Sequence, residues 1–478
     1  MESQKVLSYF SEICKIPRES GHEEMIVAYL ENFAKENSLE YKIDDSGNIV
    51  ISKEATPGME SIPTVVLQSH SDMVCEKNSD STHDFNKDPI KVVEEDGWLI
   101  AKETTLGADC GIGMAAQMAI LTDKTIEHGR IEALFTTDEE TGLTGAKALK
   151  PGFKTGNILI NLDSEDEGEL FIGCAGGIDT TAVFKYKKEP VPSGMDFMKV
   201  GFYGATGGHS GDDINKNRAN ANQLLTRFLL PIFEKYKISI CRIDGGNKRN
   251  AISREAYATI AFKPADKDKI LNLFKKTEAE ILDEYRVADP DLFGKIETTQ
   301  QEEWCMDSDT TYRLLNSLNA CPHGVLAMSQ DIPGFVETST NLASIKMTAD
   351  EEITICTSQR SSLNSARYQA ASRIESMFKL AGAQVTHESE YPGWKPKMDS
   401  RLLGVSKEAY IKLFGNEPVV RAIHAGLECG LFLDKYPNLD MISFGPTLRG
   451  VHAPGERLEL STVDKFWKLL VQILKDIK

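Results

Sequence analysis

The chain has 478 residues, more than one ordinary hydrophobic core accommodates, so we expect two domains. Its hydrophobic content of 41% and charged content of 26% are typical of a soluble globular protein. The net charge of −18 argues against a nucleic-acid or anionic-membrane partner, since either needs a basic face, whereas an acidic chain suits a site that holds cations.

The cysteines and the N-terminus indicate the compartment. The nine cysteines include no Cys-x-x-Cys pair, so the sequence predicts neither a thiolate zinc site nor a disulfide framework. Residues 1–5 lack the basic region and apolar stretch of a signal peptide, and no apolar run approaches the ~20 residues that span a bilayer. These features predict a cytoplasmic protein with reduced thiols and no membrane partner.

The first candidate site residues follow a short β-branched run at residues 64–67, of the kind that is buried in a parallel sheet. His70 and Asp72 come next and share a face, because residues two apart in an extended chain point the same way. His70 could bind a metal while the Asp72 carboxylate fixes its ring. The pair alone is weak evidence, since Asp72 could also be a simple cap.

A glycine-rich segment, Gly107–Gly113, precedes a helix expected at about residues 114–123. Gly111 and Gly113 match part of a dinucleotide-binding fingerprint, but no strand precedes them and Asp109 would repel a pyrophosphate. The better interpretation is a loop that presents Asp109 at a helix N-terminus.

Three acids follow the next apolar strand directly. Residues 131–136 are mostly apolar, and Asp138, Glu139 and Glu140 come after them. Adjacent acids repel one another unless they are solvated or surround a multivalent cation. An isolated acidic triplet is most often a solvated turn, so this segment does not decide between the two.

The same design recurs, which favours the cation. A buried-type strand at residues 156–162 ends in Asp163, and a strand at residues 441–444 precedes a glycine-rich loop that contains His452. Alternating buried strands and helices predict a doubly wound α/β sheet, in which ligands gather beyond the carboxyl ends of the strands. The candidates at such ends are His70, Asp109, Glu139, Glu140, Asp163 and His452.

This mixed set of imidazoles and carboxylates suits zinc first, with cobalt or manganese as alternatives, better than calcium. Six candidates are enough for two divalent ions roughly 3.5–4 Å apart. Asp109, Glu140 and Asp163 would balance most of the charge of two such ions, and a bridging hydroxide would balance the rest. Glu139 would then remain free to carry a proton.

The sequence predicts a separate domain in the middle of the chain. The composition changes to Lys, Glu and Pro near residues 186–192, where we place a boundary. Strand–helix alternation then appears twice between residues 195 and 390, which suggests a doubled α+β insertion. A glycine-rich turn in this region contains His209.

Six segments, in this order, carry a resemblance to a known family. They are Leu67–Met73, Gly107–Gly113, Thr137–Gly142, Asn161–Asp163, Gly207–Gly211 and Gly450–Glu456. The chain resembles the co-catalytic zinc metallopeptidases that include carnosinases, aminoacylases and succinyl-diaminopimelate desuccinylases. It looks most like their aminoacyl-histidine dipeptidase branch, also called cytosolic non-specific dipeptidases. The segments span nearly the whole chain, and no expected metal position departs from the pattern.

The resemblance implies a zinc-peptidase-type catalytic domain at residues 1–185 and 393–478, interrupted by a lid domain at residues 186–392. It also implies the metal ligands: a bridging carboxylate, then two residues for each metal. These are Asp109, then His70 with Asp163, then Glu140 with His452.

The remaining roles follow from the same resemblance. Asp72 would orient His70, and Glu139 would take a proton from the water and deliver it to the leaving amine. His209 would come from the lid and stabilise the oxyanion. A structural turn histidine remains the alternative for His209.

Two further residues are candidates for substrate binding. Arg360 offers a bidentate fork for a free carboxylate, and Asn250 could hold the substrate backbone. His424 and Glu428 could line the pocket, but a structural role is open for both.

Together these observations predict a metallodipeptidase that hydrolyses unblocked dipeptides, including Xaa-His. One alternative is a two-metal deacylase of N-acyl amino acids. Another is a non-catalytic binding protein on the same fold, and a third is a nucleotide-dependent enzyme built on the Gly111 loop. The expected partner is a small peptide; the sequence leaves open whether the chain forms a homodimer.

Overall fold

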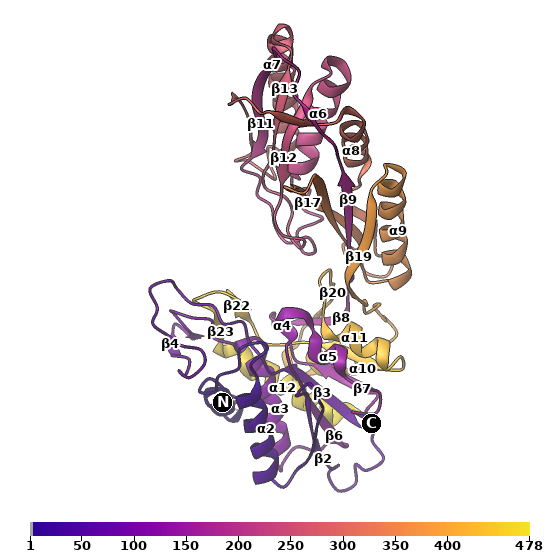
Figure 1. Cartoon of the computed structure of the whole chain (residues 1–478). Coiled ribbons are helices and arrows are strands. Elements are labelled where there is room, and N and C mark those ends of the chain that lie inside the picture. Colours follow the sequence, from indigo (N-terminus) through magenta and orange to yellow (C-terminus); the bar gives the residue numbers. More distant parts are fainter. Residues whose placement is uncertain (1–2) are drawn as a thin grey trace. The chain divides into compact units, whose positions relative to one another are not determined.

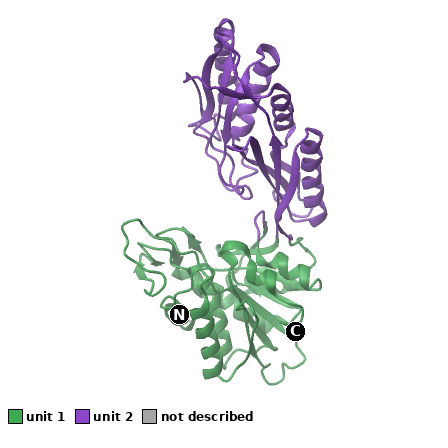
Figure 2. Cartoon of the chain, viewed as in Figure 1, with its two compact units in different colours: residues 1–173, 394–422, 427–478 green, residues 174–393, 423–426 purple. Residues whose placement is uncertain are grey.

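The structure is a computed structural model that describes residues 3–478 and divides into two compact units (Figure 2). Unit 1 comprises Met1–Gly173, Trp394–Ala422 and Leu427–Lys478, and unit 2 comprises Cys174–Gly393 and Ile423–Gly426. Unit 2 therefore begins at Cys174, not at the boundary of residue 186 placed from composition. The reason is strand β9 (Gly176–Lys185), which pairs with β18 (Glu352–Ser361) in the sheet of unit 2.

Unit 1 is built on an eight-stranded sheet in the order β1-β2-β6-β3-β7-β21-β8-β20. The four strands β6, β3, β7 and β21 are mutually parallel; β2 pairs antiparallel with β6, and β1 pairs antiparallel with β2. The strands are β1 (Glu40–Ile43), β2 (Ile49–Lys53), β3 (Val65–His70), β6 (Ile131–Thr136), β7 (Ile158–Asn161), β8 (Glu169–Cys174), β20 (Val419–Ile423) and β21 (Asp440–Ser443). Every residue of β3 and β6 is buried, as expected of parallel strands covered on both faces.

Helices cover this sheet, and a small second sheet lies beside it (Figure 1). Helix α3 packs on α1 and on β3, and α10 packs on α12 and on β21. The helices are α1 (Gln4–Ile13), α2 (Glu24–Glu36), α3 (Ala108–Thr122), α4 (Glu139–Gly142), α5 (Thr144–Ala148), α10 (Arg401–Phe414), α11 (Glu428–Lys435) and α12 (Leu460–Asp476). The small sheet has the order β22 (Leu448–Arg449), β23 (Arg457–Glu459), β5 (Trp98–Ile100) and β4 (Val93–Glu95).

Helix α3 begins within the glycine-rich segment, at Ala108, and not after it as expected, although the backbone of Asp109 and Cys110 departs from helical geometry. It is apolar nearly all round and almost wholly buried, which is typical of a helix inside a core. Gly113 allows this depth, because a Cβ there would lie 2.7 Å from the carbonyl oxygen of Leu162. The close approach brings the start of α3 beside the end of β7.

Unit 2 holds a nine-stranded sheet in which neighbouring strands are antiparallel. Its order is β14-β11-β13-β12-β17-β18-β9-β19, with β16 paired to β17. The additional strands are β11 (Asp196–Tyr203), β12 (Ser239–Gly245), β13 (Ala256–Phe262), β14 (Phe293–Thr298), β16 (Gly324–Met328), β17 (Val336–Met347) and β19 (Gln384–Tyr391); β10 (Lys188–Pro190) and β15 (Trp304–Met306) form a separate pair. The helices are α6 (Ala221–Tyr236), α7 (Lys267–Tyr285), α8 (Ser308–Ala320) and α9 (Asn364–Leu380), with a 3₁₀ turn at Pro264–Asp266.

This sheet contains the same motif twice. The elements β11-α6-β12-β13-α7-β14 form one βαββαβ motif, and β9-α8-β17-β18-α9-β19 form another with the same strand order. The two motifs meet where β12 pairs with β17. The doubled α+β insertion predicted from the alternation of strands and helices is therefore observed, with the first motif inserted into the second.

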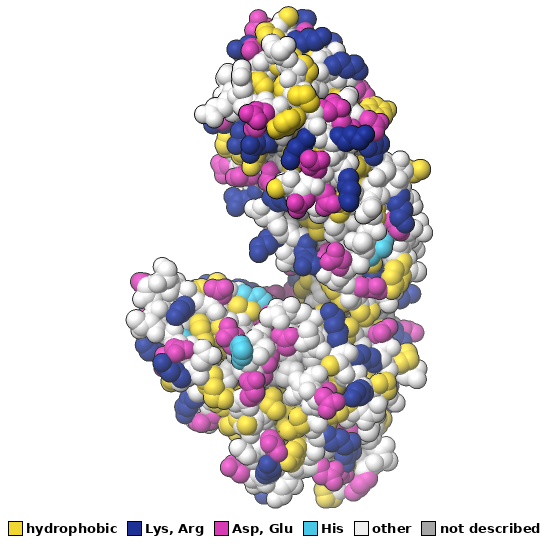
Figure 3. Space-filling view, in the orientation of Figure 1, with side chains coloured by type: hydrophobic (Ala, Val, Ile, Leu, Met, Phe, Trp, Pro, Cys, Tyr) yellow, Lys and Arg dark blue, Asp and Glu magenta, His cyan; other side chains and the backbone are white. Residues whose placement is uncertain are grey.

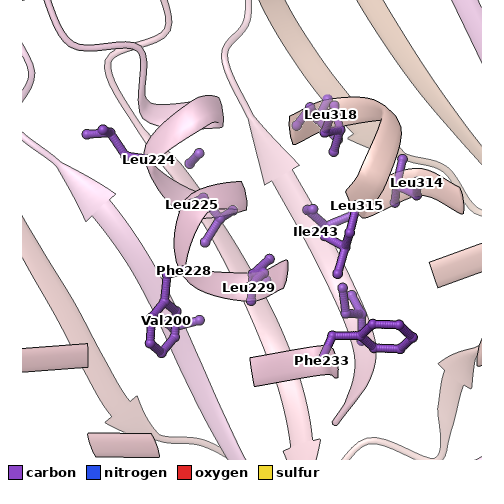
Figure 4. Packing of buried hydrophobic residues seen from close by; sticks show 14 of the residues in the cluster. Val200, Leu224, Leu225, Phe228, Leu229, Phe233, Ile243, Leu314, Leu315 and Leu318 are labelled. Carbon is purple, nitrogen blue, oxygen red and sulfur yellow. The ribbon is translucent and has the colours of Figure 1, made fainter. Parts of the chain in front are cut away.

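The core of unit 2 lies between its sheet and helices α6, α7, α8 and α9, and Figure 4 shows its part beside α6 and α8. Leu225 and Phe228 of α6 and Leu315 and Leu318 of α8 pack there, each fully or nearly fully buried. Helix α6 begins at Ala221 because the side chain of Asn220 accepts hydrogen bonds from the next backbone amides. The predicted α/β fold with an inserted α+β domain is thus confirmed.

The visible surface carries acidic and basic side chains in mixed order on each unit (Figure 3). Among residues 3–478, no helix combines the length and the apolar character that crossing a bilayer requires. The cysteines, all within this range, form no disulfide.

Candidate metal centre

Five predicted ligands come together at one edge of the unit 1 sheet. His70 is the last residue of β3, Glu140 lies in α4 just beyond β6, and Asp163 follows β7. Because these strands are parallel neighbours, their carboxyl ends meet at the same edge. Asp109, near the start of α3, and His452, in the loop between β22 and β23, reach the same place.

The Asp109 carboxylate stands between the two histidines. Its Oδ1 lies 3.1 Å from Nε2 of His70, and its Oδ2 lies 3.2 Å from Nε2 of His452. Nε2 of His70 is also 3.3 Å from Oδ1 of Asp163, and Nε2 of His452 is 3.0 Å from Oε1 of Glu140. The geometry therefore forms two half-sites that share one carboxylate.

The donor set fits a cation. The ligand atoms of His70, Asp109 and Glu140 lie within 4.8 Å of one another. Oδ1 of Asp163 is buried and, although it lies 3.3 Å from Nε2 of His70, accepts no hydrogen bond, which leaves it available to an ion. Cys110, which lies close to His70 and Asp163, donates its thiol to Leu162 O at 3.2 Å.

Asp72 links the first histidine to the acidic turn. Its Oδ1 lies 3.3 Å from Nδ1 of His70 and accepts a hydrogen bond from Glu139 N, while Oδ2 accepts from Glu140 N and from Ser20 Oγ at 2.7 Å. Burial opposes its charged form, but His70 and the other donors lower the pKa of Asp72 to about 2. Asp72 thus contacts both the His70 ring and the first backbone amides of α4, a geometry that suits orienting the ring and also suits capping. Ser20 carried no signal in the sequence.

The loop that carries Asp109 is shaped by a buried acid and a buried base. Glu456 accepts hydrogen bonds from the backbone amides of Leu106, Gly107 and Ala108 at 2.7, 2.9 and 2.8 Å. Arg18 donates to the carbonyl oxygens of Asp72, at 2.6 Å, and of Gly107. Sequence reasoning missed both roles. Glu456 ended a family segment and could have been found, whereas nothing in the sequence singled out Arg18.

The pKa values of both histidines are raised by neighbouring carboxylates, and that of Glu139 is raised mainly by burial. Burial opposes the charged form of His70, but Asp163 and Asp109 raise the pKa of His70 well above its usual range. Hydrogen bonds to Asp109 and Glu140 raise the pKa of His452 to about 11. Burial raises the pKa of Glu139 well above its ordinary value; His70 opposes this shift, and neighbouring acids such as Asp163 add to it.

The three predicted substrate-binding residues all lie in unit 2 and are close to one another. Ser210 N donates to Asn250 O at 2.8 Å, and His209 pairs with Ala251, so the two loops run side by side. Nε of Arg360 donates to Ser210 Oγ at 3.4 Å. The side chain of Asn250 itself is exposed.

Arg360 is buried yet lacks a carboxylate within ion-pair distance among residues 3–478. Its Nη1 donates to the hydroxyl of Tyr391 at 2.9 Å, a contact that the sequence did not suggest. His424 joins the same unit, where its Nε2 lies 2.7 Å from Ser339 Oγ and burial lowers its pKa to about 3. A buried guanidinium with unused donors is a suitable receptor for a carboxylate.

Glu428, grouped with His424 in the sequence interpretation, lies instead in unit 1. It is fully buried at the start of α11, and burial raises its pKa to about 8. The structure therefore separates the two residues between the units.

Comparisons with known proteins show what the chain is similar to. A model described as Peptidase family M20/M25/M40 matches residues 66–476. The chain is 42% identical over 478 residues to the "Cytosol non-specific dipeptidase" of Escherichia coli (strain K12), covering all of this chain and 98% of that protein. It is similar to the crystal structure of aminoacylhistidine dipeptidase from Vibrio alginolyticus, with TM-score 0.93, 41% identity and coverage of 100% of this chain and 98% of that one. Aminopeptidase PepT from Bacillus cereus shares the fold, with TM-score 0.58, 17% identity and coverage of 99% and 98%.

Proposed function

The chain belongs to peptidase family M20/M25/M40, and on this premise we propose that it is a metallodipeptidase that hydrolyses unblocked dipeptides, including Xaa-His. One observation carries the proposal: the Asp109 carboxylate lies between His70 and His452, each of which has a second carboxylate beside it. The relatives named as dipeptidases supply the substrate class.

Two divalent ions would be held here, one by His70 and Asp163, the other by Glu140 and His452, with Asp109 shared. Zinc suits this donor set first, and cobalt and manganese are the alternatives. When bound, such ions lower the pKa of a water molecule and polarise the peptide carbonyl.

Glu139 carries the proton in this proposal. It takes a proton from the attacking water and delivers it to the leaving amine. Its backbone amide is held by Asp72 at 3.1 Å, so the residue that orients His70 also fixes the position of the base. The raised pKa of Glu139 supports this role, because burial makes the carboxylate a stronger proton acceptor than an exposed one.

Unit 2 supplies the substrate contacts. Arg360 binds the free carboxylate of the dipeptide, Asn250 holds its backbone, and His209 stabilises the negative charge that develops on the carbonyl oxygen. The buried Arg360 guanidinium without an acidic partner supports the first of these roles. In this proposal unit 1 is the catalytic domain, unit 2 is the lid, and the enzyme acts in the cytoplasm.

A pair of substrates tests the proposal. Purified protein should cleave Ala-His, lose this activity on chelation, and regain it with zinc, cobalt or manganese, while N-acetyl-His remains intact. Cleavage of N-acetyl-His alone would instead show a deacylase of N-acyl amino acids, which shares the metal chemistry but needs no free amino group. Binding of Ala-His without cleavage, at any metal loading, would show a non-catalytic binding protein.

A further inference from the structure

A row of buried polar side chains crosses the parallel strands of unit 1 just before they end. Gln68 of β3 is in register with Asn161 of β7, which is in register with Ser443 of β21. All three are fully buried. Buried polar side chains cost free energy unless they are hydrogen-bonded, so such a row is retained only if its members satisfy one another.

The members of this row are joined by hydrogen bonds. Oε1 of Gln68 accepts from Nδ2 of Asn161 at 2.5 Å, and Oδ1 of Asn161 accepts from Oγ of Ser443. Ser443 continues to Ser164 at 2.6 Å, which ends the row on that side. The row is therefore continuous across three strands.

Glu428 ends the row on the other side. Its Oε2 accepts two hydrogen bonds, from Nε2 of Gln68 at 2.6 Å and from Oγ1 of Thr136 at 2.8 Å. Thr136 is the last residue of β6, directly before the turn that carries Glu139. One carboxyl group on α11 thus ties together the ends of β3 and β6.

The row lies two residues before the candidate metal ligands. Gln68 precedes His70 by two positions in an extended strand, so both side chains point to the same face. Asn161 precedes Asp163 by two positions, and its Oδ1 accepts a hydrogen bond from Asp163 N at 3.3 Å. A shift of Gln68 or Asn161 would therefore be transmitted to His70 or Asp163.

We propose that Glu428 is a positioning residue of this enzyme: by accepting hydrogen bonds from Gln68 and Thr136, it fixes the strand ends that carry the metal ligands and Glu139. This rests on the proposed function, which it deepens. The competing account is that Glu428 only anchors α11 to the sheet, which would affect stability and nothing else.

The chain offers a matched control for stability. Glu132 lies on β6, the same strand as Thr136, but near its opposite end, and is 3% exposed. It accepts hydrogen bonds from Thr155 N, Thr155 Oγ1 and Gly156 N at 2.7, 2.6 and 3.1 Å. Replacing either acid by leucine leaves buried hydrogen-bond donors without an acceptor. Only Glu428, however, is hydrogen-bonded to residues at the strand ends that carry the metal ligands.

The test compares Glu428→Leu, Glu428→Gln and Glu132→Leu in the full chain. Thermal unfolding gives stability, titration calorimetry gives the affinity for Co²⁺ alone, the visible spectrum of the Co²⁺-loaded protein gives coordination, and Ala-His hydrolysis gives kcat and KM. Glu428→Leu should weaken Co²⁺ binding and lower kcat by about 10–100-fold each, with KM changed less than about threefold and an altered cobalt spectrum. Glu428→Gln keeps an acceptor oxygen and should stay within about threefold throughout, while Glu132→Leu should lower only the unfolding temperature.

The proposal is overturned if Glu428→Leu behaves like Glu132→Leu, with Co²⁺ affinity, spectrum and kcat unchanged. It is also overturned if Glu428→Gln loses as much as Glu428→Leu, because the accepted hydrogen bonds would then not be what matters. If Glu428→Leu does not fold, Thr136→Val is used instead, because it removes one of the two donors to Glu428. It should weaken Co²⁺ binding and lower kcat by about 3–10-fold. Unchanged Co²⁺ affinity and kcat in Thr136→Val would overturn the proposal. The Co²⁺ measurements need no substrate, so they remain decisive even if wild-type protein cleaves no dipeptide.

Discussion

The two units assemble their polar clusters in different ways. In unit 1, three of the five candidate ligands follow the parallel neighbours β3, β6 and β7, so reading the sequence strand by strand brings them together. In unit 2 the sheet is antiparallel, and its cluster joins segments such as Ser210 and Arg360, which are 150 residues apart. In a parallel sheet, site residues can thus be predicted from the ends of successive strands. In the antiparallel sheet, the residues that meet are known only from the folded structure.

The largest expected effect is a loss of catalytic rate without loss of metal, in a variant of Glu139 in unit 1. Glu139→Ala should lower kcat by about 10²–10⁴-fold, because it removes the proton carrier and leaves the metal ligands in place. Steady-state kinetics on Ala-His together with metal analysis checks this. Glu140→Ala is the control, since it should lose metal as well as activity, and near-normal turnover of Glu139→Ala would contradict the role.

The second prediction tests whether unit 2 serves the substrate and not the metals. Arg360→Met should raise KM for Ala-His by about 10–100-fold, because a charge-assisted hydrogen bond to the substrate carboxylate is lost. Metal content should not change. Tyr391→Phe, which removes only the hydroxyl that accepts from Arg360, should have a smaller effect. Equal losses for Ala-His and for its C-terminal amide would show that Arg360 does not bind the carboxylate.

The third prediction concerns the orientation of His70. Asp72→Asn should weaken metal binding about tenfold, because the carboxylate that fixes the ring is lost. Competition with a chromogenic chelator measures this affinity. Ser20→Ala removes one hydrogen bond to Asp72 and serves as the milder control. An unchanged affinity in Asp72→Asn would leave Asp72 as a cap of α4 alone.

The smallest expected effect is on pH dependence. The pKa values of His70 and His452 are raised by carboxylates, which favours the doubly protonated, charged form of both imidazoles in the metal-free protein. Metal must displace these protons, and its affinity should therefore rise as the pH rises from about 6 to 8. Calorimetry in two buffers of different ionisation enthalpy counts the protons, and about one should leave per histidine. Release of none would show that the histidines are not displaced by metal.

Much of unit 1 was predictable because its signals are local. His70, Glu140 and Asp163 each follow an apolar strand, and the rule that parallel strands end at one edge then brings them together. Asp109 was found as an acid at the start of a helix, and His452 as a histidine in a glycine-rich loop. These features need only a few consecutive residues.

What the sequence could not give depends on distant partners. Arg18 acts on backbone carbonyl groups 54 and 89 residues away, and its own neighbourhood has no unusual pattern. The contacts of Glu428 with Gln68 and of Arg360 with Tyr391 appear only once the chain is folded. The start of unit 2 was missed for the same reason, since β9 is assigned by its pairing with β18.

The metal content of the purified protein tests the central claim most directly. Native mass spectrometry after loading with zinc, cobalt or manganese should find about two ions per chain in wild type and in Glu139→Ala, and fewer in His70→Ala and His452→Ala. This result would establish a two-metal site built from the ligands at the sheet edge, with Glu139 outside the ligand set. No retained metal in wild type, or unchanged content in both histidine variants, would contradict the account.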